Sequence, residues 1–231
     1  MDKNNQYTNM QKSQYLLGTN NHLNHNDNPD YWNVLLGDLK SADNWENKVA
    51  LDFACGKGRN VTNMLSLCHW ERVDGIDISP NNIHYCMKEY KDFSSNWYCN
   101  NGIDVSDLKD DEYDFIMSTI ALQHIPVYDI RRSILSDLLR VLKPGGLFSF
   151  QMGYGSGLAD PLGREKSEYY DNAWSAKGTN STHDVRVQSE QEIADDLKNI
   201  GYINISTVVK NSFSDMGHPQ WIYVKCYKDV A

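Results

Sequence analysis

The feature that most constrains the fold is an alternation of short apolar runs with helical patterns between residues 49 and 152. Val49–Phe53 is a short, mostly apolar run followed by small residues, as expected of a buried strand. Similar runs recur, with helical spacing of apolar residues between most of them, at 73–78, 97–99, 113–117 and 147–152. Parallel strands need crossover connections, so this alternation predicts a parallel sheet with helices on both faces.

The end of the chain predicts a different connection. Ser189 and Glu192 form a capping box that opens a helix ending near Gly201. Strand-like runs follow at 203–209 and 221–227, and the short segment between them has no helical pattern and is too short for a usual crossover. We therefore expect an α/β fold with a doubly wound, Rossmann-like, seven-stranded and mostly parallel sheet whose last strand is antiparallel.

Two segments stand apart from this pattern. Residues 1–29 are rich in Asn, Gln and His, which predicts a flexible tail or a lid before a domain at 30–231. The apolar point at Tyr15 either docks over a cleft or belongs to a disordered terminus. A stretch at about 153–187 has no clear element, and loops of this length are usually functional or disordered. We interpret it as a substrate-side insertion.

Composition argues against several classes of function. The net charge is -9 and the pI is about 5.2, which disfavours a nucleic-acid partner. No long apolar run or signal peptide is present, so we expect a cytoplasmic protein with no membrane partner. The five cysteines contain no C-x-x-C pair, and His22 and His25 lie in a polar tail, so we expect reduced thiols and no metal. The sequence leaves the oligomeric state open.

The segment after the first predicted strand has the features of a nucleoside site. Gly56 and Gly58 permit a sharp turn and a close backbone approach to a ligand, ahead of a predicted helix start near Arg59. Asp77 ends the second predicted strand, where its carboxylate can accept hydrogen bonds from ribose hydroxyls. Val61 stands where a dinucleotide fingerprint needs its third glycine, so a pyrophosphate cradle is not expected.

These residues resemble the class I S-adenosylmethionine-dependent methyltransferases. The resemblance spans Val49 to Gln151, although Ala54 replaces the usual first glycine and the region of Asn100 lacks the usual acidic residue. The motifs that carry it are Asp52 to Gly58, Val73 to Ser79, Tyr113 to Phe115, Leu122 to His124 and Arg140 to Gly146.

The resemblance implies roles for individual residues toward S-adenosylmethionine. Asp52 would lie beneath the methionine moiety and Asp77 would hold the ribose. Ile78 would pack on one face of the adenine, and Ser118 would contact the methionine part through its backbone. The remaining implied contacts come from the glycine loop and from the adenine edge, namely Ala54, Cys55, Gly56, Gly58, Gly102 and Ile103.

The expected activity is methyl transfer to a small-molecule acceptor. A sulfonium already activates its methyl group, so the protein mainly orients the nucleophile and excludes water. His124 is the candidate general base, or it orients the substrate or fills its loop. Aromatic and polar residues of the tail, the first helix and the insertion either recognise the acceptor or pack onto their own domain: Tyr15, Tyr31, Trp32, Tyr154, Trp174 and His183.

Two other functions fit parts of the sequence. The first is a different enzyme on the same cofactor, or a methyltransferase for protein or nucleic acid. It is disfavoured because the sequence shows no added recognition domain and Ser118–Ala121 stands in place of an Asn/Asp-Pro-Pro-Tyr-type motif. A non-catalytic binding module is disfavoured because Gly56, Gly58 and Asp77 are all intact, and such a module has no physical reason to keep a glycine turn with a ribose carboxylate.

Overall fold

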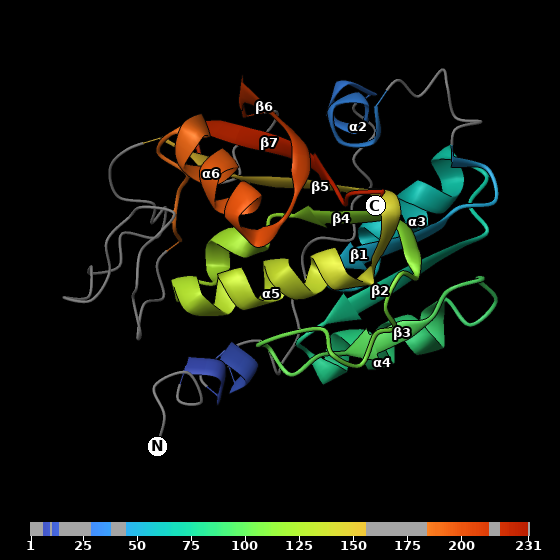
Figure 1. The fold of residues 1–231 in the computed structure, drawn as a ribbon. Helices are drawn as coiled ribbons and strands as arrows, with labels where there is room; N and C mark the ends of the chain where they lie inside the picture. Colours follow the sequence, from blue (N-terminus) through green and yellow to red (C-terminus); the bar gives the residue numbers. More distant parts are fainter. Residues whose placement is uncertain are drawn as a thin grey trace.

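A seven-stranded sheet forms the centre of the protein (Figure 1). The computed structural model describes residues 7–9, 11–13, 29–37, 45–155, 184–212 and 218–230. The strand order is β3-β2-β1-β4-β5-β7-β6, and only β7 runs antiparallel to its neighbours. The predicted sheet is thus confirmed. The strands are β1 (Val49–Phe53), β2 (Arg72–Asp77), β3 (Trp97–Cys99), β4 (Tyr113–Thr119), β5 (Leu142–Tyr154), β6 (Ile203–Asn211) and β7 (Gln220–Tyr227).

Helices α4 and α6 begin where the sequence supplies a serine cap. The Ser79 hydroxyl accepts a hydrogen bond from the Asn82 amide at 3.3 Å, and the Ser189 hydroxyl accepts one from the Glu192 amide at 3.1 Å. No helix in the described part of the chain is long and apolar enough to cross a membrane. The helices are α2 (Pro29–Leu36), α3 (Arg59–Leu67), α4 (Pro80–Glu89), the 3₁₀ turn η2 (Leu122–His124), α5 (Tyr128–Val141) and α6 (Glu190–Ile200).

Two apolar clusters hold the helices on opposite faces of the sheet. One cluster contains residues of α5 and α6, such as Leu138 and Leu197, together with Leu51 of β1. The other contains residues of α2, α3 and α4, such as Leu35 and Met64, together with Ala50 of β1. Neighbouring residues of β1 therefore face different cores, which explains why this strand is buried along its whole length.

The strand order reverses beside β1. β1 pairs with β2 on one side and with β4 on the other, so the loops that follow these strands meet at one edge of the sheet. Backbone bonds fix the loops there, because the Cys55 amide donates to the Ile76 carbonyl and the Asn100 amide donates to the Asp77 carbonyl, each at 3.0 Å. This edge is where ligands bind in open parallel sheets.

The start of the fifth strand differs from the prediction. Helix α5 ends at Val141 as its Pro-Gly-Gly stop indicates, but β5 begins at once at Leu142 and not at Leu147. Leu142 pairs with Tyr113, and the register then shifts by a bulge before Leu147 pairs with Phe115. The Gly145 amide also donates to the Lys228 carbonyl at 3.0 Å. We expected residues 142–146 to precede the strand. Pairing with residues distant in sequence instead makes them an irregular first part of β5.

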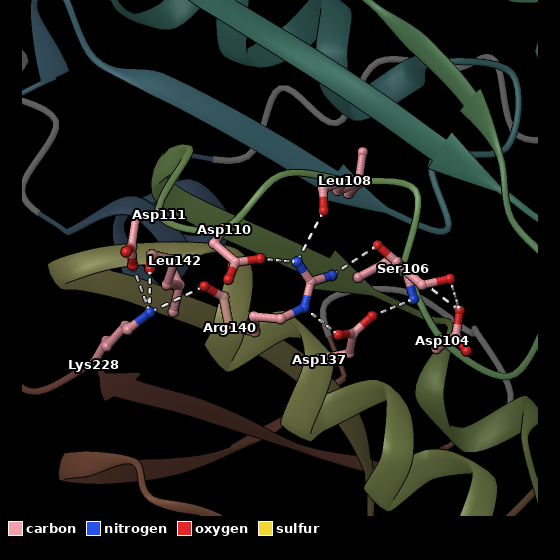
Figure 2. Close-up of polar contacts among 10 residues, drawn as sticks. Asp104, Ser106, Leu108, Asp110, Asp111, Asp137, Arg140, Leu142 and Lys228 are labelled. Carbon is pink, nitrogen blue, oxygen red and sulfur yellow. Dashed lines mark hydrogen bonds and ion pairs between the residues drawn. The ribbon is translucent and has the colours of Figure 1, made fainter.

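Arg140 of α5 clamps the loop between β3 and β4 (Figure 2). Its guanidinium donates to the Val105 carbonyl at 3.1 Å, to the Leu108 carbonyl at 2.9 Å, and also to Asp110. Asp137 accepts from Arg140 Nε at 2.6 Å and from the Val105 amide at 2.7 Å. The clamp fixes a loop that begins with Asn100 and Gly102, both of which line the cavity described below.

Replacing Arg140 tests this clamp. Arg140→Gln removes several of these donors and leaves carbonyls of the loop without partners, so we expect the free energy of unfolding to fall by about 2 kcal/mol. Arg132→Gln is the matched control, because Arg132 is exposed on the same helix, and we expect it to change stability by less than about 0.5 kcal/mol. Urea unfolding measures both variants, and equal stability of the two would contradict the clamp.

Candidate active site

A cavity of about 220 Å³ lies at the carboxyl edge of β1, β2 and β4. It lies at the point where the strand order reverses, as predicted for a ligand site of this fold. The residues that line it come from the glycine loop, the ends of β2 and β4, the segment around η2 and the N-terminal segment: Tyr7, Gln11, Phe53, Ala54, Cys55, Gly56, Lys57, Arg59, Asn60, Asp77, Ile78, Asn82, Asn100, Gly102, Thr119, Ile120, Ala121, His124, Ile125 and Ile134.

The glycine loop passes through left-handed backbone conformations. Gly56 has φ of 54° and Gly58 has φ of 81°. A Cβ built at Gly56 meets no atom within 4 Å, which leaves this part of the loop open toward the cavity. A Cβ at Gly58 would lie 2.7 Å from Tyr90 Cε2. Gly58 therefore serves close packing at the start of α3 and does not line the cavity.

Two residues that line the cavity hold a conformation that disfavours their side chains. Ala54 has φ of 61° and Ile120 has φ of 55°. A β-branched residue such as Ile120 pays a steric cost of about 1–3 kcal/mol for a positive φ. Strain of this kind persists only where the surrounding structure enforces it, and both residues directly follow central strands that end at the cavity. Sequence reasoning missed Ile120, because nothing in its local sequence signals a left-handed residue.

Asp77 ties the end of β2 to the glycine loop. One carboxylate oxygen accepts from the Gly56 amide at 2.9 Å, and the other accepts from the Ser79 amide at 2.8 Å and from Asn82 Nδ2 at 3.3 Å. Burial raises the pKa of Asp77, and the hydrogen bonds from the two backbone amides act against that rise. A buried carboxylate is thus oriented at the cavity wall, as the sequence predicts.

The Asp52 carboxylate is fully buried at the end of β1, just before the glycine loop. Its exposure is 0%, and neither carboxylate oxygen has a hydrogen-bond partner among the described residues. Burial raises its pKa to about 7, although Arg59 and Asn60 nearby lower it in part. A carboxylate with no partner in an apolar setting is costly unless something else supplies the missing charge or hydrogen bonds. Asp52 does not itself line the cavity, but Phe53, Ala54 and Cys55, which follow it in the chain, do.

Other buried polar atoms beside the cavity also lack partners within the described residues. They include Asn60 Oδ1, Asn100 Oδ1 and Ser118 Oγ. Asn60 Nδ2 donates to Thr119 Oγ1 at 2.9 Å, which links the helix after the glycine loop to the end of β4. Sequence reasoning missed Asn60, Asn82 and Thr119 as site residues, although the position of Asn60 directly after the glycine loop is a usable signal.

The N-terminal segment covers the cavity. Residues 7–9 and 11–13 are helical, and the Tyr7 side chain is only 1% exposed. Tyr7 Oη donates to the His124 carbonyl at 3.2 Å, and Gln11 Nε2 donates to the same carbonyl at 3.1 Å. The composition of residues 1–29 predicts only a tail or a lid, so Tyr7 and Gln11 were missed. Tyr15, which we expected to dock, lies outside the described residues.

His124 and Asp184 form a polar pair at the other wall. His124 Nδ1 lies 2.6 Å from Asp184 Oδ1. The Val185 amide donates to the Gln123 carbonyl at 2.9 Å and holds the two segments together. Burial acts to raise the pKa of Asp184, but its hydrogen bonds with His124 and His218 outweigh that effect and hold the pKa well below its usual range. Asp184 is therefore ionised beside His124.

The structure brings most of the predicted cofactor residues and the candidate base His124 to the cavity, but none of the predicted substrate residues that it describes. Ala54, Cys55, Gly56, Asp77, Ile78, Gly102 and His124 all line it. Asp52 and Ser118 are buried close by, whereas Gly58 and Ile103 do not line it.

The aromatic residues proposed for the acceptor have other surroundings. Tyr31 and Trp32 lie in the apolar core on the α2 side of the sheet, where Tyr31 Oη donates to Gln151 Oε1 at 3.2 Å. Tyr154 packs against the other core at the end of β5. None of these three lines the cavity. Trp174 and His183, most of the insertion at 153–187, and the pair His22 and His25 lie outside the described residues.

Comparisons with known proteins agree with this geometry. Residues 51–150 match the family model described as a methyltransferase domain. A phosphoethanolamine N-methyltransferase 2 from Caenorhabditis elegans is 27% identical over 138 residues, which cover 58% of this chain and 28% of that protein. The chain therefore matches only a minor part of this curated relative.

Solved structures share the fold. A SAM-dependent methyltransferase from Methanosarcina mazei superposes with a TM-score of 0.62 at 19% identity, over 82% of this chain and 97% of the other. Phosphoethanolamine N-methyltransferase 2 from Haemonchus contortus, solved with phosphomonomethylethanolamine and S-adenosylhomocysteine, gives 0.56 at 17% identity, over 84% and 53%.

The burial of Asp52 predicts a dependence of stability on pH. Its pKa is about 7 in the folded protein and about 4 in an unfolded chain. The folded state therefore binds the proton more tightly, and the free energy of unfolding falls as pH rises from 4 to 7. Asp52→Asn removes this contribution, so its stability relative to the parent protein should rise by roughly 3 kcal/mol across that window.

Urea unfolding of the ligand-free protein between pH 4 and 8 measures this effect. Asp92→Asn, at an exposed loop position, is the control and should keep a constant difference from the parent. A constant difference for Asp52→Asn as well would show that the buried carboxylate does not titrate in this way.

Proposed function

We propose that the chain, whose residues 51–150 match the family model described as a methyltransferase domain, transfers a methyl group from S-adenosylmethionine to a small molecule. The observation that carries the proposal is the buried Asp52 carboxylate, which has no partner among the described residues, beneath a glycine loop that opens toward the cavity. When bound, S-adenosylmethionine supplies a methyl group that its sulfonium has already activated.

The residues present fit this cofactor. Its ammonium group meets the need of Asp52 for a positive partner, and its ribose hydroxyls suit the carboxylate of Asp77. The open space at Gly56 admits a ligand close to the backbone, which a side chain at this position would obstruct. Ile78 and Gly102 supply an apolar wall next to Asp77 for the adenine. The polar and apolar parts of the cavity therefore match the polar and apolar parts of one molecule.

The protein's contribution to methyl transfer is orientation and exclusion of water. Holding two reactants in line is worth roughly 7–11 kcal/mol of the barrier. Tyr7 and Gln11 close the cavity on one side by binding the backbone of His124, so solvent is excluded while the site is covered. His124 lines the same cavity and is the candidate base for an acceptor that must lose a proton.

We propose a small amine as the acceptor. A cover built from the chain's own N-terminal segment restricts entry to the cavity, which favours a small molecule over a macromolecule. The net charge of -9 attracts cations by long-range steering. The curated relative and one solved structure are named as phosphoethanolamine methyltransferases, so ethanolamine-type amines are the first acceptors to test.

Cofactor binding depends on Asp77 in this proposal. Calorimetric titration with S-adenosylhomocysteine should give micromolar binding by the parent protein, weakened at least tenfold by Asp77→Asn, because a ribose contact worth about 1.4 kcal/mol is lost. Asp107→Asn, at an exposed position of the β3–β4 loop, should bind as the parent does. Thermal melting checks that Asp77→Asn is folded. Absence of binding by the parent protein would refute the proposed function.

The acceptor class is tested by product release. Formation of S-adenosylhomocysteine is followed with ethanolamine, phosphoethanolamine, amino acids, phenols, a mixed peptide pool and total RNA as acceptors. We expect turnover with a small amine and none with peptide or RNA. Turnover only with the macromolecular pools would contradict the small-molecule assignment, and turnover only with phenols or anions without an amine would contradict the amine.

A further inference from the structure

A chain of polar side chains leads from the cavity wall into the protein. His124 Nδ1 lies 2.6 Å from Asp184 Oδ1, and Asp184 Oδ2 lies 3.3 Å from His218 Nε2. Arg186 Nε donates to His218 Nδ1 at 3.0 Å. His218 is 4% exposed, whereas the His124 side chain is 35% exposed at the cavity. This row of polar side chains therefore runs from the buried Arg186 and His218 to the partly exposed His124 at the cavity.

The chemistry of the donors fixes the proton positions along this chain. Arginine donates only, so His218 Nδ1 must be an acceptor and the ring proton lies on Nε2. His218 Nε2 then donates to Asp184. An ionised Asp184 accepts only, so its bond with His124 requires a proton on His124 Nδ1. Neutral His124 consequently carries its free lone pair on Nε2.

His218 is held rigidly enough to fix these positions. A Cβ built at Gly153 would lie 2.4 Å from His218 Nδ1, so the absence of a side chain at Gly153 makes room for the ring. The ring of Trp221 packs edge-on against it, with centroids 4.7 Å apart and an interplanar angle of 76°. The backbone bond from Val185 to Gln123 places Asp184 beside His124. Three segments distant in sequence thus converge on one arrangement of donors and acceptors.

We propose that Arg186, His218 and Asp184 act as positioning residues that hold His124 in the tautomer with a bare Nε2, and that His124 takes a proton from the acceptor. The proposal rests on the proposed methyl transfer and narrows it to acceptors whose nucleophilic nitrogen or oxygen carries a proton. This is the logic of a histidine oriented by a buried carboxylate, which stabilises the imidazolium without itself becoming protonated.

The proton and electron balance is complete without a further reactant. The acceptor's lone pair forms a bond to the methyl carbon while the carbon–sulfur bond breaks and its electron pair stays on sulfur. The acceptor's proton passes to His124 Nε2, and the resulting imidazolium keeps its Nδ1 proton and donates it in the hydrogen bond to Asp184. Because the His124 side chain is 35% exposed, it passes the proton to solvent when the cover opens for product release.

Nitrogen NMR of histidine-labelled protein tests the tautomers without any cofactor. At a pH where the rings are neutral, we expect His124 to be protonated on Nδ1 and His218 on Nε2. The signals are assigned with His124→Gln and His218→Asn. Protonation of His124 on Nε2 in the parent protein would overturn the proposal. The tautomers are measured on the parent protein, and the variants serve only to assign its signals.

Asp184→Asn tests the link to catalysis. We expect His124 to lose its preference for Nδ1 protonation and kcat to fall at least tenfold, while the Kd of S-adenosylhomocysteine stays within twofold. Asp195→Asn, at an exposed position of α6, is the matched control and should change neither. An unchanged His124 signal or an unchanged kcat in Asp184→Asn would overturn the proposal.

The two proposals fail in different ways. If the parent protein does not bind S-adenosylhomocysteine, the proposed methyl transfer is wrong whatever the histidine tautomers are. If it binds and turns over an acceptor but His124 has the other tautomer, methyl transfer stands and only the positioning chain is wrong.

Discussion

The proposed cofactor site depends on the carboxylate of Asp52, whose oxygens are buried without a hydrogen-bond partner among the described residues. Asp52 belongs to β1, the strand beside which the strand order reverses, and apolar cores on both faces exclude water from it. The energetic cost of such burial is large for an ionised group and small for a protonated one, which is why its pKa rises to about 7. A bound cation reverses this preference. Under the proposed function, ligand binding and protonation of Asp52 are therefore linked.

Two residues at the cavity edge near Asp52 hold strained backbone conformations. Ala54 and Ile120 both adopt positive φ where β1 and β4 reach the cavity, and the packing on either side enforces that conformation. The cover has a different character, because Tyr7 and Gln11 reach the site through hydrogen bonds to a single carbonyl, that of His124. Apolar packing adds to these bonds, because Tyr7 also belongs to the core cluster that contains Leu51.

Local sequence patterns predicted the sheet and the cofactor loop because the signals there are local. Strand burial, the caps at Ser79 and Ser189, and the glycines after β1 depend on neighbours within a few residues. The remaining features depend on contacts across the fold. Composition did not reveal that Tyr7 reaches His124, 117 residues away. Aromaticity alone could not decide between acceptor binding and packing for Tyr31 and Trp32, which lie in a core. Asp184 lies beside His124 because the Val185 amide bonds to the Gln123 carbonyl, a contact between segments about 60 residues apart.

A crystal structure of the complex with S-adenosylhomocysteine tests the central claim most directly. The account predicts that the ligand fills the cavity, with its amino group beside Asp52 and its ribose at Asp77, so that the Asp52 carboxylate gains the partner it lacks in the described structure. Ligand bound elsewhere on the protein, or bound in the cavity while Asp52 stays buried without a partner, would contradict the claim that this carboxylate specifies the cofactor.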